Sequence, residues 1–264
     1  DGFFRPDEPL RRVDCAQLLY NLTQDIPRSA EPAQYDDVLP EYWYYEAVSA
    51  VGGYLPQAEG ETRFFPSESI MPDAFVTALL AALGQTEQSA PPELLQAAQA
   101  LTPDGAQGEE VPAPAPVTRA QAAVLVNRAL GREPDAEAIG SVCRSLLLDV
   151  PEDRADYADL VEAVLPHEYY LDGTDTQEHY RADALNALSW APGLHLSGTS
   201  GYFVGSDGRV ARGTGFLDVQ GRRYYRCDES GRIVADYAPH YVEGHAVFIR
   251  ADGILRRSCT FGEY

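Results

Sequence analysis

Apolar residues follow a helical spacing through the first two thirds of the chain and a strand-like alternation in the last third. The stretch PVTRAQAAVLVNRALG (116–131) shows the helical pattern, with Thr118 as a favourable N-cap residue. From about residue 190, short alternating runs separated by Gly-containing turns predict β-hairpins. We therefore expect an α+β protein, in which a mainly helical region is followed by a small antiparallel module. The apolar stripe of the quoted helix consists of Ala120, Val124, Leu125, Ala129 and Leu130.

The helical region is built from repeated segments. Arg12, Pro72 and Arg119 occupy the same position when three Pro-containing leads and the helices that follow them are aligned. A Pro in the first helical turn is tolerated, because its missing N–H has no helical partner there. The three segments are FRPDEPLRRVDCAQLLYNL (4–22), FFPSESIMPDAFVTALLAALG (64–84) and PAPAPVTRAQAAVLVNRALG (112–131). A second, shorter helix recurs in YDDVLPEYWYYEAVSA (35–50), PPELLQAAQA (91–100) and LLDVPEDRADYADLVEA (147–163).

This pattern resembles the S-layer homology family over about residues 1–165. In that family each unit reads roughly F-x-D-V, a Trp-containing helix, a Gly-rich loop, F-x-P and then I-T-R-A-E at the start of a longer helix. One unit is matched by Asp37, Val38, Trp43, Gly60, Phe65 and Pro66, another by Val117, Thr118, Arg119 and Ala120, and a third in part by Leu10, Arg12 and Asp14. The resemblance implies a pseudo-threefold helical bundle that binds an anionic secondary cell-wall polysaccharide, often one that carries pyruvate ketals.

The chain departs from the family pattern at three positions. Pro72 replaces the motif arginine in one unit, while Asp156 and Glu93 stand where two other units would carry tryptophan. If the three grooves of the family are equivalent, at most two keep their arginine and one keeps its tryptophan.

Arg119 poses a physical question, since it lies in the first turn of a helix, where the helix dipole favours an anion. One interpretation is an anion site made by the guanidinium group together with free N–H groups of the helix start. The alternative is an ion pair with one of the many neighbouring acids. Arg12 is open to the same two interpretations.

Four consecutive aromatic residues, 42–45, stand at a predicted helix start. Flat aromatic side chains suit sugar rings, but four neighbours on a helix cannot all face one groove, so at least two must pack elsewhere. We expect Trp43 to face the sugar. With the residues that match the family motif, the expected ligand-binding set is Arg119, Thr118, Arg12, Trp43 and Asp37.

Charge and hydropathy limit the partners. The formal net charge is −21, with 41 acidic against 20 basic residues, which argues against nucleic acid and anionic lipid surfaces. Lys is absent, so an anion site must use Arg, His or backbone N–H groups. We find no run of about 18 apolar residues that would span a membrane. Because the chain begins at Asp1, we expect that any signal peptide has been removed or left out. The resemblance to S-layer homology units implies a location outside the cell, at the cell wall.

The last third of the chain repeats as well. Three segments, beginning at Tyr202, Gly215 and His240, align on Gly208, Gly231 and Gly253. They resemble the β-hairpin repeats of choline-binding and related cell-wall-binding modules, although none of the three contains Trp. We predict a helical domain at 1–170, a linker with a helix at 171–197 and a β-hairpin module at 198–264.

Catalytic and metal motifs are missing from the sequence. Its cysteines show no CxxC spacing, and we interpret Cys15 and Cys143 as small buried hydrophobes, whereas Cys227 and Cys259 could pair. The histidines at 167, 179, 195, 240 and 245 lack ligand spacing, and Gly-x-Ser-x-Gly does not occur. We therefore expect no enzyme activity, no cofactor and no metal.

Together these patterns favour a non-catalytic surface module that attaches noncovalently to an anionic cell-wall polysaccharide of a Gram-positive bacterium. Two alternatives stay open. One is a structural or protein-interaction scaffold whose glycan grooves have decayed. The other is a hydrolase with an unrecognised site near residues 165–200 or between domains.

Overall fold

The computed structural model describes residues 3–23, 33–101, 115–137, 139, 147–164, 190–236, 239–242 and 245–256, and the backbone of 169–170 and 179–180. The chain divides into two compact units. The first, called the helical unit below, is Pro6–Glu133; the second, called the mixed unit, combines Asp1–Arg5 with Pro134–Tyr264. This division differs from the predicted domain boundaries at 170 and 197, because it groups residues from Pro134 onward with the strands.

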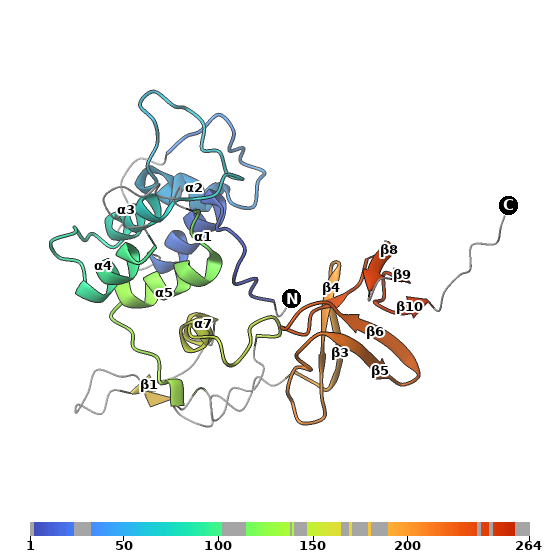
Figure 1. Cartoon of the computed structure of the whole chain (residues 1–264). Helices are drawn as coiled ribbons and strands as arrows, with labels where there is room; N and C mark the ends of the chain where they lie inside the picture. The colour runs from blue at the N-terminus through green and yellow to red at the C-terminus, as the bar shows by residue number, and fades with distance from the viewer. Residues whose placement is uncertain are drawn as a thin grey trace, which may run out of the picture. The chain divides into compact units, whose positions relative to one another are not determined.

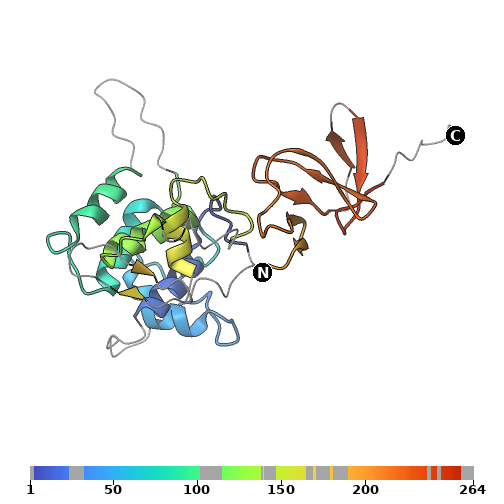
Figure 2. The same cartoon turned by 90° about the horizontal axis from the view of Figure 1, so that it is seen from below.

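The structure describes six short helical elements in the helical unit. Its core is formed by side chains such as Leu19, Phe64, Phe75 and Leu125, all essentially inaccessible to solvent. Helix α3 packs against α1, α4 and α5 (Figure 1 and Figure 2). The elements are α1 (Arg12–Leu22), α2 (Tyr45–Val51), the 3-10 turn η1 (Gly52–Tyr54), α3 (Pro72–Ala82), α4 (Pro92–Gln99) and α5 (Arg119–Ala129). The three helix starts that the sequence alignment predicts are therefore found at the aligned residues.

Helix ends follow the expected chemistry. Thr118 is the N-cap of α5, and it forms a capping box with Gln121. At the other end, Gly84 and Gly131 adopt φ values of 66° and 68° after α3 and α5. Glycine accommodates this left-handed conformation without a Cβ clash, which allows both helices to stop within one residue.

The three extended leads meet in a closed ring of backbone hydrogen bonds. The amide of Leu10 donates to Val117 O (2.7 Å), that of Val117 to Ile70 O (2.9 Å) and that of Ile70 to Leu10 O (2.9 Å). All three side chains are buried in the core. Each lead therefore contributes one residue, two positions before its helix, to the same small cluster.

The mixed unit consists of one described α-helix and antiparallel strands, which confirms the predicted α+β class. The helix is α7 (Tyr157–Val164), and a two-residue pair joins β1 (Tyr169–Tyr170) to β2 (His179–Tyr180). A five-stranded sheet has the order β3 (Gly193–Ser197), β4 (Ser200–Val204), β7 (Ile233–Val234), β6 (Arg222–Arg226) and β5 (Gly215–Val219). A three-stranded sheet has the order β10 (Leu255–Arg256), β9 (His245–Ile249) and β8 (Pro239–Val242).

The glycines on which the last third of the sequence aligns share one conformation. Gly208, Gly231 and Gly253 have φ values of 77°, 83° and 76°. A side chain at Gly231 would also clash, since its Cβ would lie 2.2 Å from Ala211 O. The turns are thus found at the predicted residues, while the equivalence of the strands as repeats stays a prediction.

Candidate functional site

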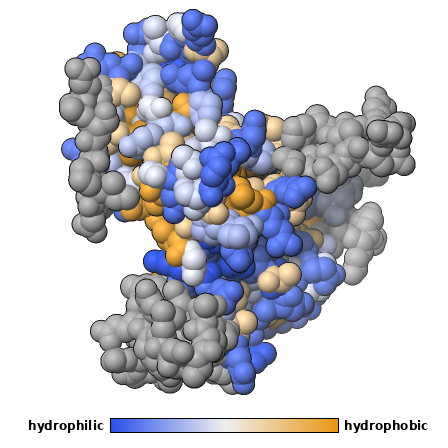
Figure 3. All heavy atoms as spheres, turned by 90° about the vertical axis from the view of Figure 1, so that its left-hand side faces the viewer, coloured by the Kyte–Doolittle hydropathy of each residue, from blue (hydrophilic) through white to orange (hydrophobic). Residues whose placement is uncertain are grey.

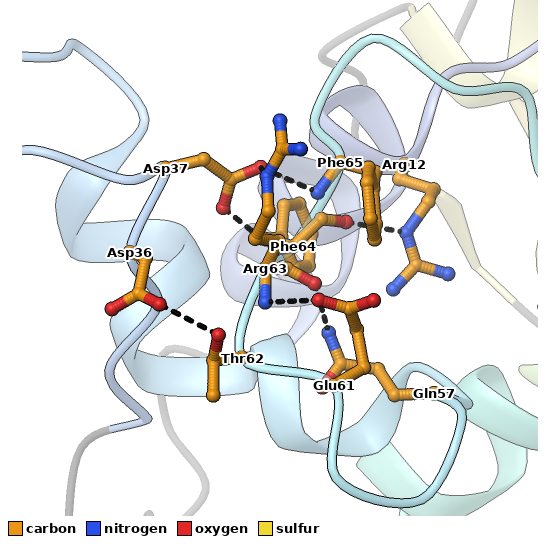
Figure 4. A network of polar contacts seen from close by, with 9 residues as sticks. All are labelled: Arg12, Asp36, Asp37, Gln57, Glu61, Thr62, Arg63, Phe64 and Phe65. Atoms are coloured by element: carbon orange, nitrogen blue, oxygen red, sulfur yellow. Dashed lines mark hydrogen bonds and ion pairs between the residues drawn. The ribbon is translucent and has the colours of Figure 1, made fainter.

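A tight turn at Phe64–Pro66 is held by Asp37. The amides of Phe64 and Phe65 donate to the two oxygens of the Asp37 carboxylate, at 2.7 and 2.8 Å. Phe65 has a φ of 56°, a conformation that non-glycine residues rarely adopt, and the two hydrogen bonds compensate for its cost. Asp37, which the family motif suggests as a ligand residue, therefore already has two backbone partners within the chain (Figure 4).

Asp149 holds an equivalent turn in the mixed unit. The amides of Phe4 and Arg5 donate to its carboxylate oxygens at 2.8 and 2.6 Å, and Arg5 again has a φ of 56°. The sequence interpretation missed this residue. The signal that could have found it is the Asp-Val pair, which occurs at 37–38 and again at 149–150.

Arg12 binds carbonyl oxygens of the loop before α3. Its Nε donates to Phe64 O (2.8 Å) and its Nη1 to Pro56 O (3.2 Å), and the guanidinium lies 5.0 Å from the centre of the Phe64 ring. Among the described residues no carboxylate pairs with Arg12, so the alternative interpretation, an ion pair with a neighbouring acid, is not found there. The cation at the helix start is instead matched to carbonyl groups (Figure 4).

The first amides of α5 and α1 are also occupied. The Arg119 amide donates to Glu8 O and the Ala120 amide to Pro6 O, both at 2.9 Å. At α1, the amides of Arg12 and Val13 donate to Glu68 O (2.7 Å) and Pro66 O (3.1 Å). The lead of one helix therefore covers the start of another.

Thr118 is engaged in the same way. Its hydroxyl oxygen accepts from the Gln121 amide (3.2 Å), and its own amide donates to Gln121 Oε1 (2.9 Å). The sequence interpretation combined a guanidinium with free helix amides at Arg119. That part of the interpretation is wrong, because the amides of Arg119, Ala120 and Gln121 all have acceptors within the chain. Any anion site at α5 must therefore depend on side chains.

Trp43 is the most exposed aromatic residue described in the helical unit, with 66% of its surface accessible. It stands just before α2 and contacts Tyr44 edge to face, with ring centres 5.3 Å apart. Tyr42 and Leu39 are exposed beside it in the sequence, whereas Tyr44 and Tyr45 pack against the core. The prediction that at least two of the four aromatics pack elsewhere is confirmed.

The predicted site residues fall into three places. Arg12 and Asp37 belong to one network around the Phe64 turn, together with Arg63, whose guanidinium lies 4.7 Å from the Phe65 ring centre and 3.9 Å from Asp37 (Figure 4). Thr118 and Arg119 lie at the start of α5. Trp43 shares no recorded hydrogen bond or ring contact with either group of described residues.

Arg212 is a second, half-buried clamp that the sequence interpretation missed. Its Nη1 donates to Leu148 O (2.7 Å) and Ser230 O (2.8 Å), and its Nη2 donates to Val150 O (2.8 Å). Burial lowers the pKa of this guanidinium from its usual value. Arg212 thus fixes the Asp149–Val150 segment to the strands of the mixed unit.

The outer face of β5 and β6 carries exposed aromatic and charged groups. Phe216 pairs with Tyr225 at 5.7 Å between ring centres, and Arg223 lies 5.4 Å from the Phe216 ring centre. Arg223 also binds both carboxylate oxygens of Asp218 at 2.8 Å, and this hydrogen bonding lowers the pKa of Asp218. On strand β8, Tyr241 is 83% exposed.

The cysteine and histidine environments offer little chemistry. Cys15 is fully buried, as predicted, and burial raises its pKa to about 12; burial also raises the pKa of the half-buried Cys227. Since the thiolate is the reactive form, both are poor nucleophiles at neutral pH. Among the described histidines, His195 bonds Ala191 O (2.7 Å) and His240 bonds Asp236 (2.6 Å). Cys143, Cys259, His167 and the side chains of His179 and His245 lie outside the described residues.

No described cluster of three or more His, Cys, Asp or Glu side chains is arranged to hold a metal ion. Within the same described ranges, every helix is too short or too polar to cross a bilayer. Comparison of the chain with protein-family models, with curated proteins and with solved structures gives no match.

Proposed function

We propose that this chain is a non-catalytic surface module that attaches noncovalently to an anionic cell-wall polysaccharide of a Gram-positive bacterium. The observation that carries the proposal is the exposure of Trp43, a large flat ring that is held edge-on against Tyr44 yet remains two-thirds accessible. A tryptophan in this setting presents apolar surface and an N–H group to a sugar ring at little cost in conformational entropy.

The proposal includes a pseudo-threefold arrangement of S-layer-homology-like units. Two observations support it: the cyclic hydrogen bonds among Leu10, Ile70 and Val117, and the matched turns held by Asp37 and Asp149. The equivalence of the hairpins in the mixed unit with cell-wall-binding repeats is part of the same proposal, supported by the common conformation of the three aligned glycines.

Acidic groups of the polysaccharide would pair with arginine side chains, because the amides of the helix starts are occupied. Arg63 is more than half exposed, and its stacking on Phe65 keeps the guanidinium in one region of the surface. Arg119 is the second candidate, by its place in the motif. A planar guanidinium matches a carboxylate such as that of a pyruvate ketal in a two-pronged geometry.

The test is retention of the full chain on purified wall material, with and without its acidic polysaccharide. Trp43→Ala should lower retention by about tenfold, as expected for the loss of one aromatic platform at 1–2 kcal/mol. Leu130→Ala removes an exposed apolar side chain of the helical unit that lies outside both the aligned motif residues and the hairpins, and it is the control, which should bind normally. Absence of retention by the unmodified chain would contradict the proposal, and normal retention of an Arg12→Ala/Arg119→Ala variant would remove both arginines from the site.

A second candidate function is a protein-interaction scaffold with decayed glycan grooves. It is favoured by the observation that Arg12 and the first amides of α1 and α5 are all bonded within the chain. Under this alternative the chain stays folded and fails to bind wall material, and light scattering detects association with itself or with a partner. A hydrolase stays a third, weaker alternative, which release of sugars or peptides from wall substrates would reveal.

A further inference from the structure

A groove of about 450 Å³ lies between α3 and α4 in the helical unit. Its walls carry apolar side chains from both helices, among them Val76 and Leu80 from α3 and Leu95 and Ala98 from α4. Figure 3 faces the side on which α4 lies in Figure 1, and apolar surface gathers there between hydrophilic regions. The volume falls within the range of about 300–1,000 Å³ that is typical of small-molecule sites.

One polar atom in this groove is buried and unpaired. Gln85 lines the groove, and its Oε1 has no hydrogen-bond partner among the described residues. The Gln85 backbone is fixed by the helix C-cap, since its amide donates to Leu80 O at 2.8 Å and Gly84 has a φ of 66°. The loop that follows is fixed as well, by hydrogen bonds between Thr86 and Ser89. A buried acceptor in a preformed apolar wall favours a ligand that donates a hydrogen bond there.

The charged side chains that line the groove are all negative. Its lining residues include the carboxylates of Asp73 and Glu87 and contain no Arg or His. Neither carboxylate has an ion-pair partner among the described residues. Pro72, which also lines the groove, stands where α1 and α5 carry arginine. Residues 6–133 contain 19 acidic against 7 basic residues, so the surrounding field also favours a cation over an anion.

We infer that the α3–α4 groove binds a small organic cation, with a primary ammonium group attached to an apolar body of about ten heavy atoms. The ammonium group donates to Gln85 Oε1 and is attracted by Asp73 and Glu87, while the apolar body lies against Val76, Leu80 and Leu95. This inference does not depend on the proposed attachment to polysaccharide, because it concerns another surface and a ligand of opposite charge.

The experiment compares three probes of one shape on the full chain: 4-phenylbutylamine, 4-phenylbutan-1-ol and 4-phenylbutyrate. Chemical-shift changes in NMR spectra give the dissociation constants and locate the bound probe. We expect millimolar binding of the amine, about tenfold tighter than that of the carboxylate, with the alcohol between them. The affected signals should come from α3, α4 and residues 85–87.

Two groove variants separate the contributions. Asp73→Asn/Glu87→Gln should reduce the affinity of the amine to that of the alcohol, because only the amine is charged. Gln85→Leu should weaken both the amine and the alcohol by about three- to tenfold, since each loses its acceptor. The matched control is Glu46→Gln/Glu93→Gln, which changes the net charge equally at residues outside the groove and should alter the affinity of the amine less than twofold.

The inference is overturned if the carboxylate binds as tightly as the amine, or if none of the probes binds at about 20 mM. It is also overturned if the control pair weakens the amine as much as the groove pair does, because the general field would then account for the preference. None of these outcomes bears on wall retention, which is measured separately.

Discussion

The two Asp-Val segments of this protein each hold a turn of the same kind, but the residues around the two turns differ. At 37–38 and at 149–150, the carboxylate accepts hydrogen bonds from two successive amides of a turn, and the valine is buried. In both turns a residue other than glycine sits at a φ of 56°. The task that both segments keep is therefore to hold a strained turn.

The difference lies in the surroundings of the two segments. In the helical unit an exposed Trp43 follows, and Arg12 clamps the turn through Phe64 O. In the mixed unit the position of Trp43 is taken by the exposed Ala155, and not by Asp156 as the sequence alignment predicted, because the hydrogen bonds of the two turns and the two helix starts correspond at an offset of 112 residues, Tyr157 against Tyr45. Asp156 follows Ala155 and forms an ion pair with Arg154 at 2.8 Å. There the more buried Arg212 binds the carbonyls on either side of Asp149. The shared Asp-Val motif thus indicates the same local structure in both segments. The residues that differ around it are the candidates for a function that only one segment has.

The largest effect is expected when either turn-holding carboxylate is removed. Asp37→Ala and Asp149→Ala should each lower the free energy of unfolding by about 3 kcal/mol, because two amides lose a charged acceptor at about 1.5–3 kcal/mol each, with incomplete additivity. Urea unfolding gives the size of the loss. Hydrogen exchange gives its location, at residues 64–65 for the first variant and at residues 4–5 for the second.

Asparagine variants at the same positions are the controls. Asp37→Asn and Asp149→Asn keep one carbonyl acceptor, so about half of the loss should be recovered. If Asp37→Ala left exchange at 64–65 unchanged, or if both alanine variants loosened the same unit, the equivalence of the two segments would be wrong.

The sequence predicted the α+β class and the helix starts well, because capping residues, Pro positions and apolar periodicity act over a few residues. It could not predict the roles of Asp37 and Arg12, since their partners at Phe64 and Pro56 are distant in sequence and are backbone groups that carry no residue signature. For the same reason, the sequence could not show that the carbonyl oxygens of Pro6 and Glu8 accept hydrogen bonds from the first amides of α5. Conversely, the sequence analysis selected Trp43 among the four aromatic residues 42–45, and its exposure agrees with that selection. Sugar binding by Trp43 is still a proposal.

The next largest effect should separate the two arginine clamps. Arg212→Ala should lower the free energy of unfolding by about 2–3 kcal/mol, because three charge-assisted bonds to carbonyl oxygens are lost from a partly desolvated site. Arg12→Ala should cost about 1–2 kcal/mol, since it removes two such bonds at a more exposed site. Urea unfolding of both variants measures the difference.

Lysine variants test the geometry of the clamps. Arg212→Lys should recover little stability, because one ammonium group cannot reach three carbonyls that a planar fork spans. Full recovery by lysine at position 212 would indicate that charge alone matters there.

A smaller effect is expected at the Asp156–Arg154 pair. Hydrogen bonding by Arg154 lowers the pKa of Asp156 from its ordinary value of 3.8. The pair therefore contributes stability at pH above that ordinary value, and the contribution is lost as the pH falls through the lowered pKa. Asp156→Asn should cost less than about 1 kcal/mol at pH 7, and its stability should converge with that of the unmodified chain as the pH falls through the lowered pKa of Asp156. A difference that persisted after the Asp156 carboxyl is protonated would have to come from packing.

The smallest effect on stability belongs to the residue on which the proposed function most depends. Trp43→Ala removes a side chain that is 66% exposed, so we expect the free energy of unfolding to change by no more than about 0.5 kcal/mol. Retention on wall material should nevertheless fall by about tenfold. The reverse substitution, Ala155→Trp, places an aromatic residue at the equivalent position of the other Asp-Val segment and leaves the Arg154–Asp156 pair in place. If the segments are equivalent, this variant should gain retention over Ala155→Leu, which adds an apolar side chain without a ring. Equal retention of Ala155→Trp and Ala155→Leu would mean that a tryptophan needs more than this position to bind sugar, and would direct attention to the neighbours of Trp43, above all Tyr42 and Leu39.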